Sequence, residues 1–242
     1  MAMLENVLDE LQIISKIVFE GNNNVGIHDT SIVGLYGDIY DKCSTINFLI
    51  ENKEYSGVEV LLRVVFEQKI YLDYICENDS INRGKAYFYN DQMSMIRMRN
   101  ALLKKGEPGK EIRKFLNMTA DQIKVLSGQL NNEEGMKRLK NEFNSCFEHN
   151  KPRTWYDFNG HVNSFEGLCI YLKKGHEYDT IYRIFSRNVH GATGFSRFDF
   201  LGDILYLNQF QGVQNPQAFD RIASTLLKQS AEIVSKYYFE TK

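Results

Sequence analysis

The sequence contains very little proline, and this scarcity favours long, uninterrupted helices. Pro108, Pro152 and Pro216 are the only three in 242 residues. A proline inside a helix removes a backbone hydrogen bond and clashes with the preceding turn, so proline-free stretches can form long helices. Apolar residues recur in these stretches at intervals of three and four, whereas no β-alternating run exceeds a few residues. The pattern predicts an all-α protein, built as an antiparallel helical bundle with short connections.

The sequence also lacks a long apolar run, a leader segment and any clustering of its cysteines. No stretch approaches the roughly 20 apolar residues that span a bilayer, and residues 1–6 carry no basic segment or cleavage pattern. Cys43, Cys76, Cys146 and Cys169 are far apart, which argues against a zinc cluster or a disulfide framework. We therefore expect a cytoplasmic protein without membrane contact, whose thiols are reduced and mostly buried.

Nor does the sequence contain a recognisable cofactor or metal motif. It has no phosphate-binding P-loop, no dinucleotide-binding glycine motif and no G-x-S-x-G nucleophile turn. Its five histidines include no pair at metal-ligand spacing, and no acidic cluster resembles a calcium loop. We expect neither a metal nor a cofactor, so any chemistry would come from the side chains themselves.

An excess of basic charge is absent as well, although basic residues gather in one region. The formal net charge is −2, from 29 Lys and Arg and 31 Asp and Glu, which argues against a protein that coats nucleic acid by bulk charge. The local basic region consists of Arg97, Arg99, Lys104, Lys105, Lys110, Arg113 and Lys114. Such a region is typical of a solvated helix face, but the same residue types also track an RNA backbone.

Helical periodicity extends over most of the chain. Two capping-box sequences, Ser56–Glu59 and Thr119–Gln122, mark helix starts, and Asn215-Pro216 marks the start of the last helix. The segments between about 107 and 150 are short and polar, so we interpret them as a helical insertion in a single all-α domain over 1–242. The predicted helices cover about residues 4–19, 29–52, 56–76, 82–105, 110–116, 119–129, 132–148, 163–175, 178–191 and 217–240.

The stretch over residues 178–191 carries the most information about function. Its apolar stripe, which predicts a buried helix face, consists of Tyr178, Ile181, Tyr182, Phe185 and Val189. A second stripe holds Arg183, Arg187 and His190, since positions i, i+4 and i+7 share a helix face. Ser186 lies one turn before His190. Arginine offers a fixed fork for phosphate and histidine titrates near neutral pH, so the pattern predicts an anion-binding site.

A second feature is the pair Arg63 and Glu67, four residues apart inside the apolar stretch 58–75. The simplest interpretation is a helix ion pair worth roughly a few tenths of a kcal/mol. In the alternative interpretation the pair faces His190, where a carboxylate on one imidazole nitrogen would fix its tautomer and raise its basicity. The candidate site therefore comprises Arg63, Glu67, Tyr182, Arg183, Ser186, Arg187 and His190.

Two of these stretches, residues 61–67 and 182–191, resemble a large family of bacterial helical proteins that is catalogued as a domain of unknown function. The segment 155–172 also looks like that family, and the likeness covers about residues 30–200. Members of the family often lie near anti-phage genes. The resemblance implies an all-helical component of a bacterial or phage conflict system.

The sequence is more distantly similar to HEPN domains, all-helical proteins of which many are metal-independent ribonucleases. Their signature is an arginine followed, after a short spacer, by a histidine, and six residues separate Arg183 from His190. The sequence departs from that family at Ile184, where many members have a polar residue after the arginine. The resemblance implies RNA cleavage in which Arg183 or Arg187 holds the phosphate and His190 transfers a proton.

The HEPN resemblance also implies a homodimer, because such sites are often completed across a two-fold interface. The predicted final helix has apolar residues available for packing, namely Ile222, Leu226, Leu227, Ile233, Val234 and Tyr237. The alternative is a non-enzymatic helical module that binds a partner protein of a defence system, a nucleotide signal or a phage component. A phage-encoded antagonist of host defence belongs to this second class.

Overall fold

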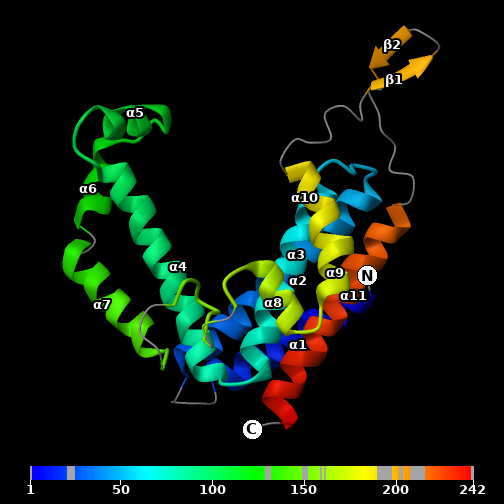
Figure 1. Cartoon of the computed structure of the whole chain (residues 1–242), viewed down its shortest axis with the longest axis horizontal. Helices are drawn as coiled ribbons and strands as arrows, with labels where there is room; N and C mark the ends of the chain where they lie inside the picture. The colour runs from blue at the N-terminus through cyan, green and yellow to red at the C-terminus, as the bar shows by residue number, and fades with distance from the viewer. Residues whose placement is uncertain are drawn as a thin grey trace. The chain divides into compact units, whose positions relative to one another are not determined.

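The computed structural model of the chain is predominantly helical, which confirms the predicted all-α fold (Figure 1). It describes residues 2–20, 25–128, 132–148, 152–158, 160, 162–189, 198–201, 204–207 and 216–240. The chain divides into two compact units. The first unit is Met1–Ser80 with Ser164–Lys242, and the second unit is Ile81–Asn163.

Helices dominate both units, and their bounds agree with the predicted helices to within about one turn. The first unit contains α1 (Ala2–Ser15), η1 (Lys16–Glu20), α2 (Ile27–Glu51), α3 (Val58–Glu77), α8 (Phe165–Tyr171), α9 (Gly175–Glu177), η2 (Tyr178–Arg183), α10 (Ile184–Val189), the strands β1 (Phe198–Leu201) and β2 (Ile204–Leu207), α11 (Pro216–Ser235) and η4 (Lys236–Glu240), where η denotes a π-helical segment. Helix α4 (Ser80–Leu103) leads into the second unit, which continues with α5 (Glu107–Phe115), α6 (Ala120–Gly128) and α7 (Asn132–Ser145). Among the described helices, none is both long and apolar enough to cross a membrane.

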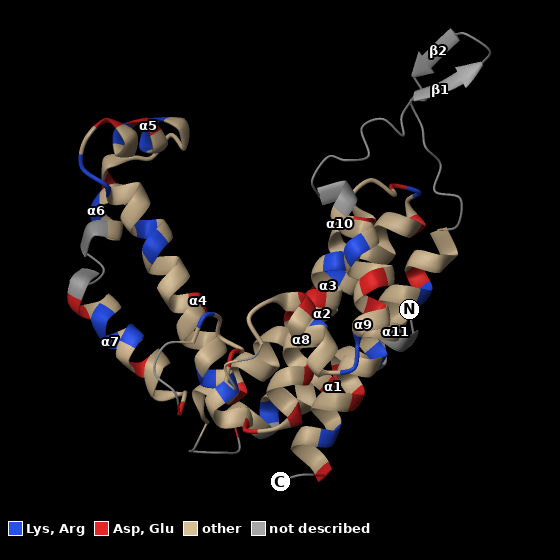
Figure 2. Cartoon of the chain, in the orientation of Figure 1, with Lys and Arg blue, Asp and Glu red and all other residues tan. Residues whose placement is uncertain are grey.

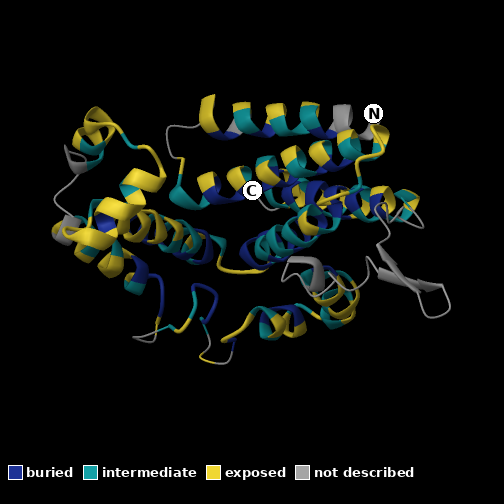
Figure 3. Ribbon diagram, turned by 90° about the horizontal axis from the view of Figure 1, so that it is seen from above, coloured by how far each residue is buried: buried dark blue, intermediate teal, exposed yellow. Residues whose placement is uncertain are grey.

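Helix α3 lies at the centre of the first unit, where it packs against both α2 and α11. Its buried side chains recur every three or four residues, as in Leu62, Phe66 and Ile70, each at most 1% exposed. This spacing keeps them on one side of the helix, so α3 can cover two neighbours at once. The helices of this unit have a buried and an exposed side (Figure 3), as the helical periodicity of the sequence predicts.

The final helix uses its apolar face inside its own unit. Leu226, Leu227 and Val234, which were expected to be available for dimer packing, are buried. Helix α11 packs against α2 and α3. The homodimer stays a prediction, but the main apolar face of this helix does not support it.

The two predicted capping boxes have different outcomes. One is present, because the Gln122 N–H donates to Thr119 Oγ1 at 3.2 Å and the Thr119 N–H donates to Gln122 Oε1 at 2.9 Å. The box predicted at Ser56–Glu59 is wrong. Gly57 is the N-cap of α3 there, with a left-handed φ of 89° and no side-chain cap. Glycine adopts this conformation without steric penalty, so the chain enters the helix without the Ser56 hydroxyl.

A short β-hairpin follows α10 along the chain, although the sequence has no β-alternating run longer than a few residues. Strands β1 and β2 are antiparallel, with Phe198 opposite Leu207. Each strand has only four residues, too few for an alternating pattern to be distinctive. The available signal was Gly202-Asp203 between two apolar runs, since a Gly-Asp pair is common between hairpin strands.

The second unit has its own aromatic contacts. The ring centre of Trp155 lies 5.0 Å from that of Tyr87, and Phe147 lies 4.4 Å from Phe158. The Trp155–Tyr87 contact ties the segment after α7 to α4, and the Phe147–Phe158 contact lies within that segment. Aromatic pairs at such distances are stabilising. The unit contains the whole of residues 107–150, and their interpretation as an insertion in one domain stays a prediction.

The first unit buries an ion pair in its helical core. The Lys69 ammonium lies 2.5 Å from Asp73 Oδ2, one turn along α3, and the two side chains are 4% and 10% exposed. Burial raises the pKa of the Asp73 carboxyl, and the nearby Lys69 opposes that shift. Removal of one partner from such a pair is strongly destabilising, because it leaves an uncompensated charge away from water.

We expect Asp73→Ala to lower the free energy of unfolding by about 3–5 kcal/mol, because it leaves the buried Lys69 ammonium without its carboxylate. The double variant Lys69→Met with Asp73→Leu removes both charges and should be at least as stable as the wild type. Urea denaturation followed by circular dichroism measures both. A loss of less than about 1 kcal/mol in the single variant would mean that solvent reaches Lys69.

Candidate functional site

Helix α10 lies beside α3 (Figure 1). Arg63 on α3 contacts both η2 and α10, which carry most of the predicted site. Its Nε donates a hydrogen bond to Ser186 Oγ at 2.9 Å, and its Nη2 donates to the Tyr182 hydroxyl at 2.6 Å. The guanidinium carbon also lies 4.4 Å from the centre of the Tyr182 ring, within the range of a cation–π contact. One side chain therefore holds both η2 and α10 against α3.

Glu67 and Tyr71 extend this arrangement along α3. Glu67 Oε2 lies 3.7 Å from Arg63 Nη2, and the Tyr71 hydroxyl donates to Glu67 Oε1 at 2.9 Å. The Arg63 and Glu67 side chains are 19% and 28% exposed, so the pair is partly withdrawn from water. Sequence reasoning missed Tyr71, although it continues the four-residue spacing of the other two. The Arg63 cluster comprises Arg63, Glu67, Tyr71, Tyr182 and Ser186.

Aromatic rings surround Tyr182 and fix its orientation. Its ring centre lies 4.6 Å from that of Phe165 on α8. The Tyr178 ring is 5.2 Å away and nearly parallel, and the Phe66 ring on α3 is 6.5 Å away. Packing on several sides leaves the ring little freedom, so its hydroxyl stays within reach of Arg63.

The helix that carries Tyr182 is not a regular α-helix. Residues Tyr178–Arg183 form the π-helical segment η2, and α10 follows from Ile184. A π-helix has i→i+5 hydrogen bonds and places more residues in each turn than an α-helix does. The α-helical stripe predicted over residues 178–191 therefore changes phase within the segment.

The structure separates Arg183 from the Arg63 cluster. The Arg183 side chain is 61% exposed and pairs with Glu166 at 3.2 Å and with Asp179 at 3.4 Å. Its guanidinium also lies 5.5 Å from the centre of the Tyr178 ring. Glu166 belongs to α8, and no spacing rule connects it with Arg183, so sequence reasoning had no signal for this ion pair.

The remaining members of the predicted site lie at the end of α10 or beyond it. Arg187 is within α10, but its side chain lies outside the described residues, and His190 lies wholly outside them. The predicted contact of Arg63 and Glu67 with His190 therefore stays a prediction. So does the face that Arg183, Arg187 and His190 would share. The structure brings together Arg63, Glu67, Tyr182 and Ser186.

The cysteines are free, and Cys43, Cys146 and Cys169 are buried, as predicted. Burial raises the pKa of the Cys43 and Cys169 thiols to about 12. Thiols of that kind stay protonated near neutral pH and are poor nucleophiles. Within the described ranges, no group of three or more His, Cys, Asp or Glu side chains is placed to hold a metal ion.

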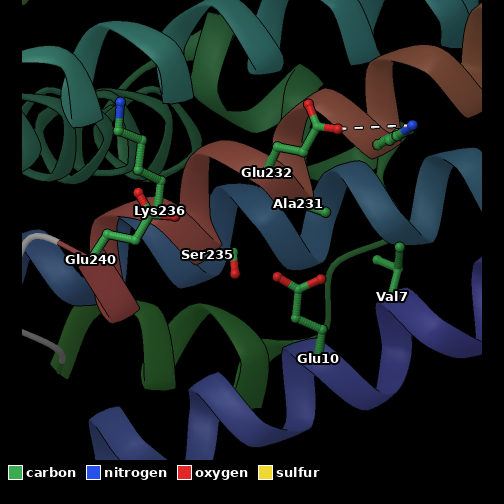
Figure 4. A pocket seen from close by; sticks show the side chains of 8 residues that line it. Val7, Glu10, Ala231, Glu232, Ser235, Lys236 and Glu240 are labelled. Carbon is green, nitrogen blue, oxygen red and sulfur yellow. Dashed lines mark ion pairs between the residues drawn. The ribbon is translucent and has the colours of Figure 1, made fainter.

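A separate groove of about 540 Å³ lies between α1 and the C-terminal helix of the first unit. Figure 4 shows the Glu10 carboxylate and the Ser235 hydroxyl pointing toward each other there, and the Tyr36 hydroxyl approaches Glu10 Oε2 at 3.5 Å. At the rim, Lys228 lies 3.9 Å from Glu232. Burial raises the pKa of the Glu10 carboxyl by more than the hydrogen bonds from Ser235 and Tyr36 lower it.

A family profile matches residues 29–203, which is more than half of the chain. The chain belongs to DUF5677, a family of unknown function. All of the Arg63 cluster falls within the DUF5677 match, whereas Glu10 and Ser235 of the groove lie outside it. Comparisons with curated proteins and with solved structures gave no match.

Arg63→Ala should lower the free energy of unfolding by about 2–3 kcal/mol, because it removes charge-assisted hydrogen bonds to Tyr182 and Ser186 in a partly buried place. Arg183→Ala should cost less than about 1 kcal/mol, since its ion pairs are exposed. Chemical denaturation of the two variants measures the difference. An equal loss of unfolding free energy in the two variants would show that Arg63 does not hold η2 and α10 against α3.

Glu10 should make the stability depend on pH. The pKa of the Glu10 carboxyl is raised in the folded chain from the usual 4.5, so this carboxyl ionises at a lower pH in the unfolded chain than in the folded one. The stability therefore falls as the pH rises between the two pKa values. Glu10→Gln keeps the shape and cannot ionise. It should raise the Tm near about pH 7 and change little below about pH 4, where both states of the wild type are protonated.

Scanning calorimetry at the two pH values tests this expectation. Glu232→Gln is the matched control, because that side chain lines the same groove and is 63% exposed. The Glu232→Gln variant should show no comparable pH-dependent rise in Tm. A lower Tm for Glu10→Gln at neutral pH would contradict the expectation, since it would mean that the ionised carboxylate is stabilising.

Proposed function

We propose that the chain is a HEPN-like, metal-independent endoribonuclease of a bacterial or phage conflict system, acting in the cytoplasm. The observation that carries the proposal is the attachment of η2 and α10 to α3 by Arg63. This attachment fixes the helical turn that comes directly before Arg187 and, along the sequence, before His190. A nuclease without a metal depends on phosphate-binding and proton-transferring side chains held in one geometry, and a clamped helix provides that constraint.

In the proposed reaction, the ribose 2′-oxygen attacks phosphorus and the bond to the 5′-oxygen of the next nucleotide breaks. The products are a cyclic phosphate and a free 5′-hydroxyl. His190 takes the proton from the 2′-hydroxyl or protonates the departing oxygen. Arg187 or Arg183 holds the phosphate and offsets its developing charge. At Arg183 the phosphate would replace Glu166 and Asp179, whose exposed ion pairs each contribute less than about 1 kcal/mol.

The proposal includes a homodimer, because HEPN-like sites are often completed across a two-fold interface. The buried face of α11 does not provide that interface. Ile184 on α10 is 55% exposed and Ile170 on α8 is 63% exposed. These two helices belong to the same unit as the Arg63 cluster and offer apolar surface for a second copy.

One observation also supports a non-enzymatic function. Arg63 uses both its Nε and its Nη2 in hydrogen bonds within the chain, as a structural polar lock would. In that case the Arg63 cluster would hold α10 as part of a binding surface for a partner protein, a nucleotide signal or a phage component. A phage-encoded antagonist of defence is included in this alternative.

The two functions differ in the effect of His190→Ala. For the nuclease, the wild type should degrade RNA in the presence of a chelator, and His190→Ala should abolish this at a stability cost of about 1–2 kcal/mol or less. Phe185→Ala should instead cost roughly 3–5 kcal/mol, because its ring is 6% exposed and packs edge-on against Phe219 at 6.0 Å. Gel assays of RNA cleavage and thermal melts measure the two effects.

A chelator that abolishes cleavage, or a folded His190→Ala protein with full activity, would exclude the proposed chemistry. A wild type that leaves RNA intact in these assays would favour the binding module. If His190→Ala unfolds the chain as severely as Phe185→Ala, then His190 is a structural group and not a catalytic one.

A further inference from the structure

The small net charge of the chain conceals an uneven distribution between its units. The second unit, Ile81–Asn163, contains 15 Lys and Arg against nine Asp and Glu, whereas the first unit contains 14 against 22. Figure 2 shows Lys and Arg recurring along α4 and the helices that follow it. A basic surface on one unit attracts polyanions even when the whole chain is slightly acidic.

Close packing of α5 on the end of α4 brings several of these basic residues together at the junction of the two helices, which we call the α4–α5 corner. Arg113 Nη1 donates to the carbonyl oxygens of Leu102 at 2.6 Å and Lys104 at 3.2 Å. A Cβ atom on Gly109 would lie 1.9 Å from the Lys104 carbonyl oxygen, so only glycine permits this approach. The link between the helices, which carries Lys104 and Lys105, is therefore folded tightly against α5.

The corner presents free cationic groups and one flat ring. Lys104, Lys105 and Lys114 are exposed, and Phe115, at the end of α5, is 88% exposed. Lys110 is also exposed and pairs with Glu107 at 3.4 Å, a surface ion pair that a competing phosphate can replace at little cost. Among the cations of the corner, Arg113 donates its hydrogen bonds to backbone carbonyls, so it stabilises the fold of the segment that carries the lysines.

We propose that this α4–α5 corner binds the backbone of single-stranded nucleic acid, with Lys104, Lys105 and Lys114 on phosphates and Phe115 stacking on a base. Basic residues beside exposed aromatic rings are the usual elements of single-strand binding. The alternative occupant, an acidic protein helix, would contact the apolar side chains Ile112, Phe115 and Leu116, which are 38%, 88% and 52% exposed. The exposed lysines beside the Phe115 ring favour a single strand instead, because it offers a phosphate and a base together. The choice of RNA over DNA rests on the proposed function.

Counterion release gives a quantitative test. The probes are oligouridine RNA and its 2′-deoxy counterpart, each longer than about 16 nucleotides to exceed ordinary site sizes. The triple variant Lys104→Gln, Lys105→Gln and Lys114→Gln should bind both at least tenfold more weakly. It should also reduce the slope of log K against log salt by about two, because each phosphate contact on a single strand contributes about 0.7. Fluorescence anisotropy in chelator over a range of salt concentrations measures affinity and slope.

A matched control removes three exposed lysines from the first unit: Lys16→Gln, Lys53→Gln and Lys228→Gln. It should keep the wild-type affinity and slope. Phe115→Ala should lower affinity about tenfold, the effect of losing one stacked base, and leave the slope unchanged. Circular dichroism establishes that each variant is folded.

The outcomes separate this proposal from the nuclease. The 2′-deoxy probe lacks the 2′-hydroxyl that attacks phosphorus in the proposed reaction, so it stays intact. Its binding can therefore be measured whether or not the protein cuts RNA. Binding of the deoxy probe without any RNA cleavage would support the corner and reject the nuclease. Unchanged affinity in the triple variant would contradict nucleic-acid binding at the α4–α5 corner. The proposal would also be wrong if polyglutamate competed as well as the oligonucleotides, since an acidic protein would then be the better occupant.

Discussion

A guanidinium group that is partly withdrawn from water must find hydrogen-bond acceptors, and Arg63 finds them on a distant part of the chain. Tyr182 and Ser186 lie 119 and 123 residues further along. The contact therefore fixes where η2 and α10 run relative to α3. Loss of this side chain would leave polar groups unsatisfied in a partly dry place, which costs more than the loss of an exposed hydrogen bond. The direction of α10, on which every hypothesis about Arg187 and His190 depends, is set in part by that one residue.

Polar contacts recur between the helices of the first unit and supplement its apolar packing. The Tyr238 hydroxyl in η4 donates to Asp29 in α2 at 3.1 Å, and the Tyr36 hydroxyl in α2 approaches Glu10 in α1 at 3.5 Å. Apolar faces can repack in several ways at similar free energy, whereas a buried hydrogen bond is satisfied in only one arrangement. Such contacts select one relative placement of helices that apolar packing alone would leave less defined.

The division of charge changes how the composition is interpreted. A net charge of −2 argues against nucleic-acid binding when the chain is treated as one body. The excess of basic residues in the second unit and of acidic residues in the first removes that objection. The proposed chemistry uses residues of the first unit, and the proposed binding corner lies in the second. Recognition and reaction would then be encoded in separate units and can be tested by separate variants.

The sequence by itself determined the helices, the Thr119 capping box, the Arg63–Glu67 pair and the burial of most cysteines. The helices, the capping box and the ion pair follow from residues a few positions apart, and the burial of the cysteines follows from the apolar character of a free cysteine side chain. Local spacing also suggested the box at Ser56, but a left-handed Gly57 replaced it, because the approach of the preceding loop decides which residue caps a helix.

Only the tertiary structure decided which residues meet Arg63, why Arg183 turns toward Glu166, and where the Glu10 groove lies. These contacts join segments far apart in the chain, and residue spacing carries no information about them. The π-helical turn at Tyr178–Arg183 belongs with them, since it shifts the side chains out of the α-helical phase that sequence patterns assume. Periodicity can assign a residue to a helix face, but the partner of that face is chosen when the whole chain packs.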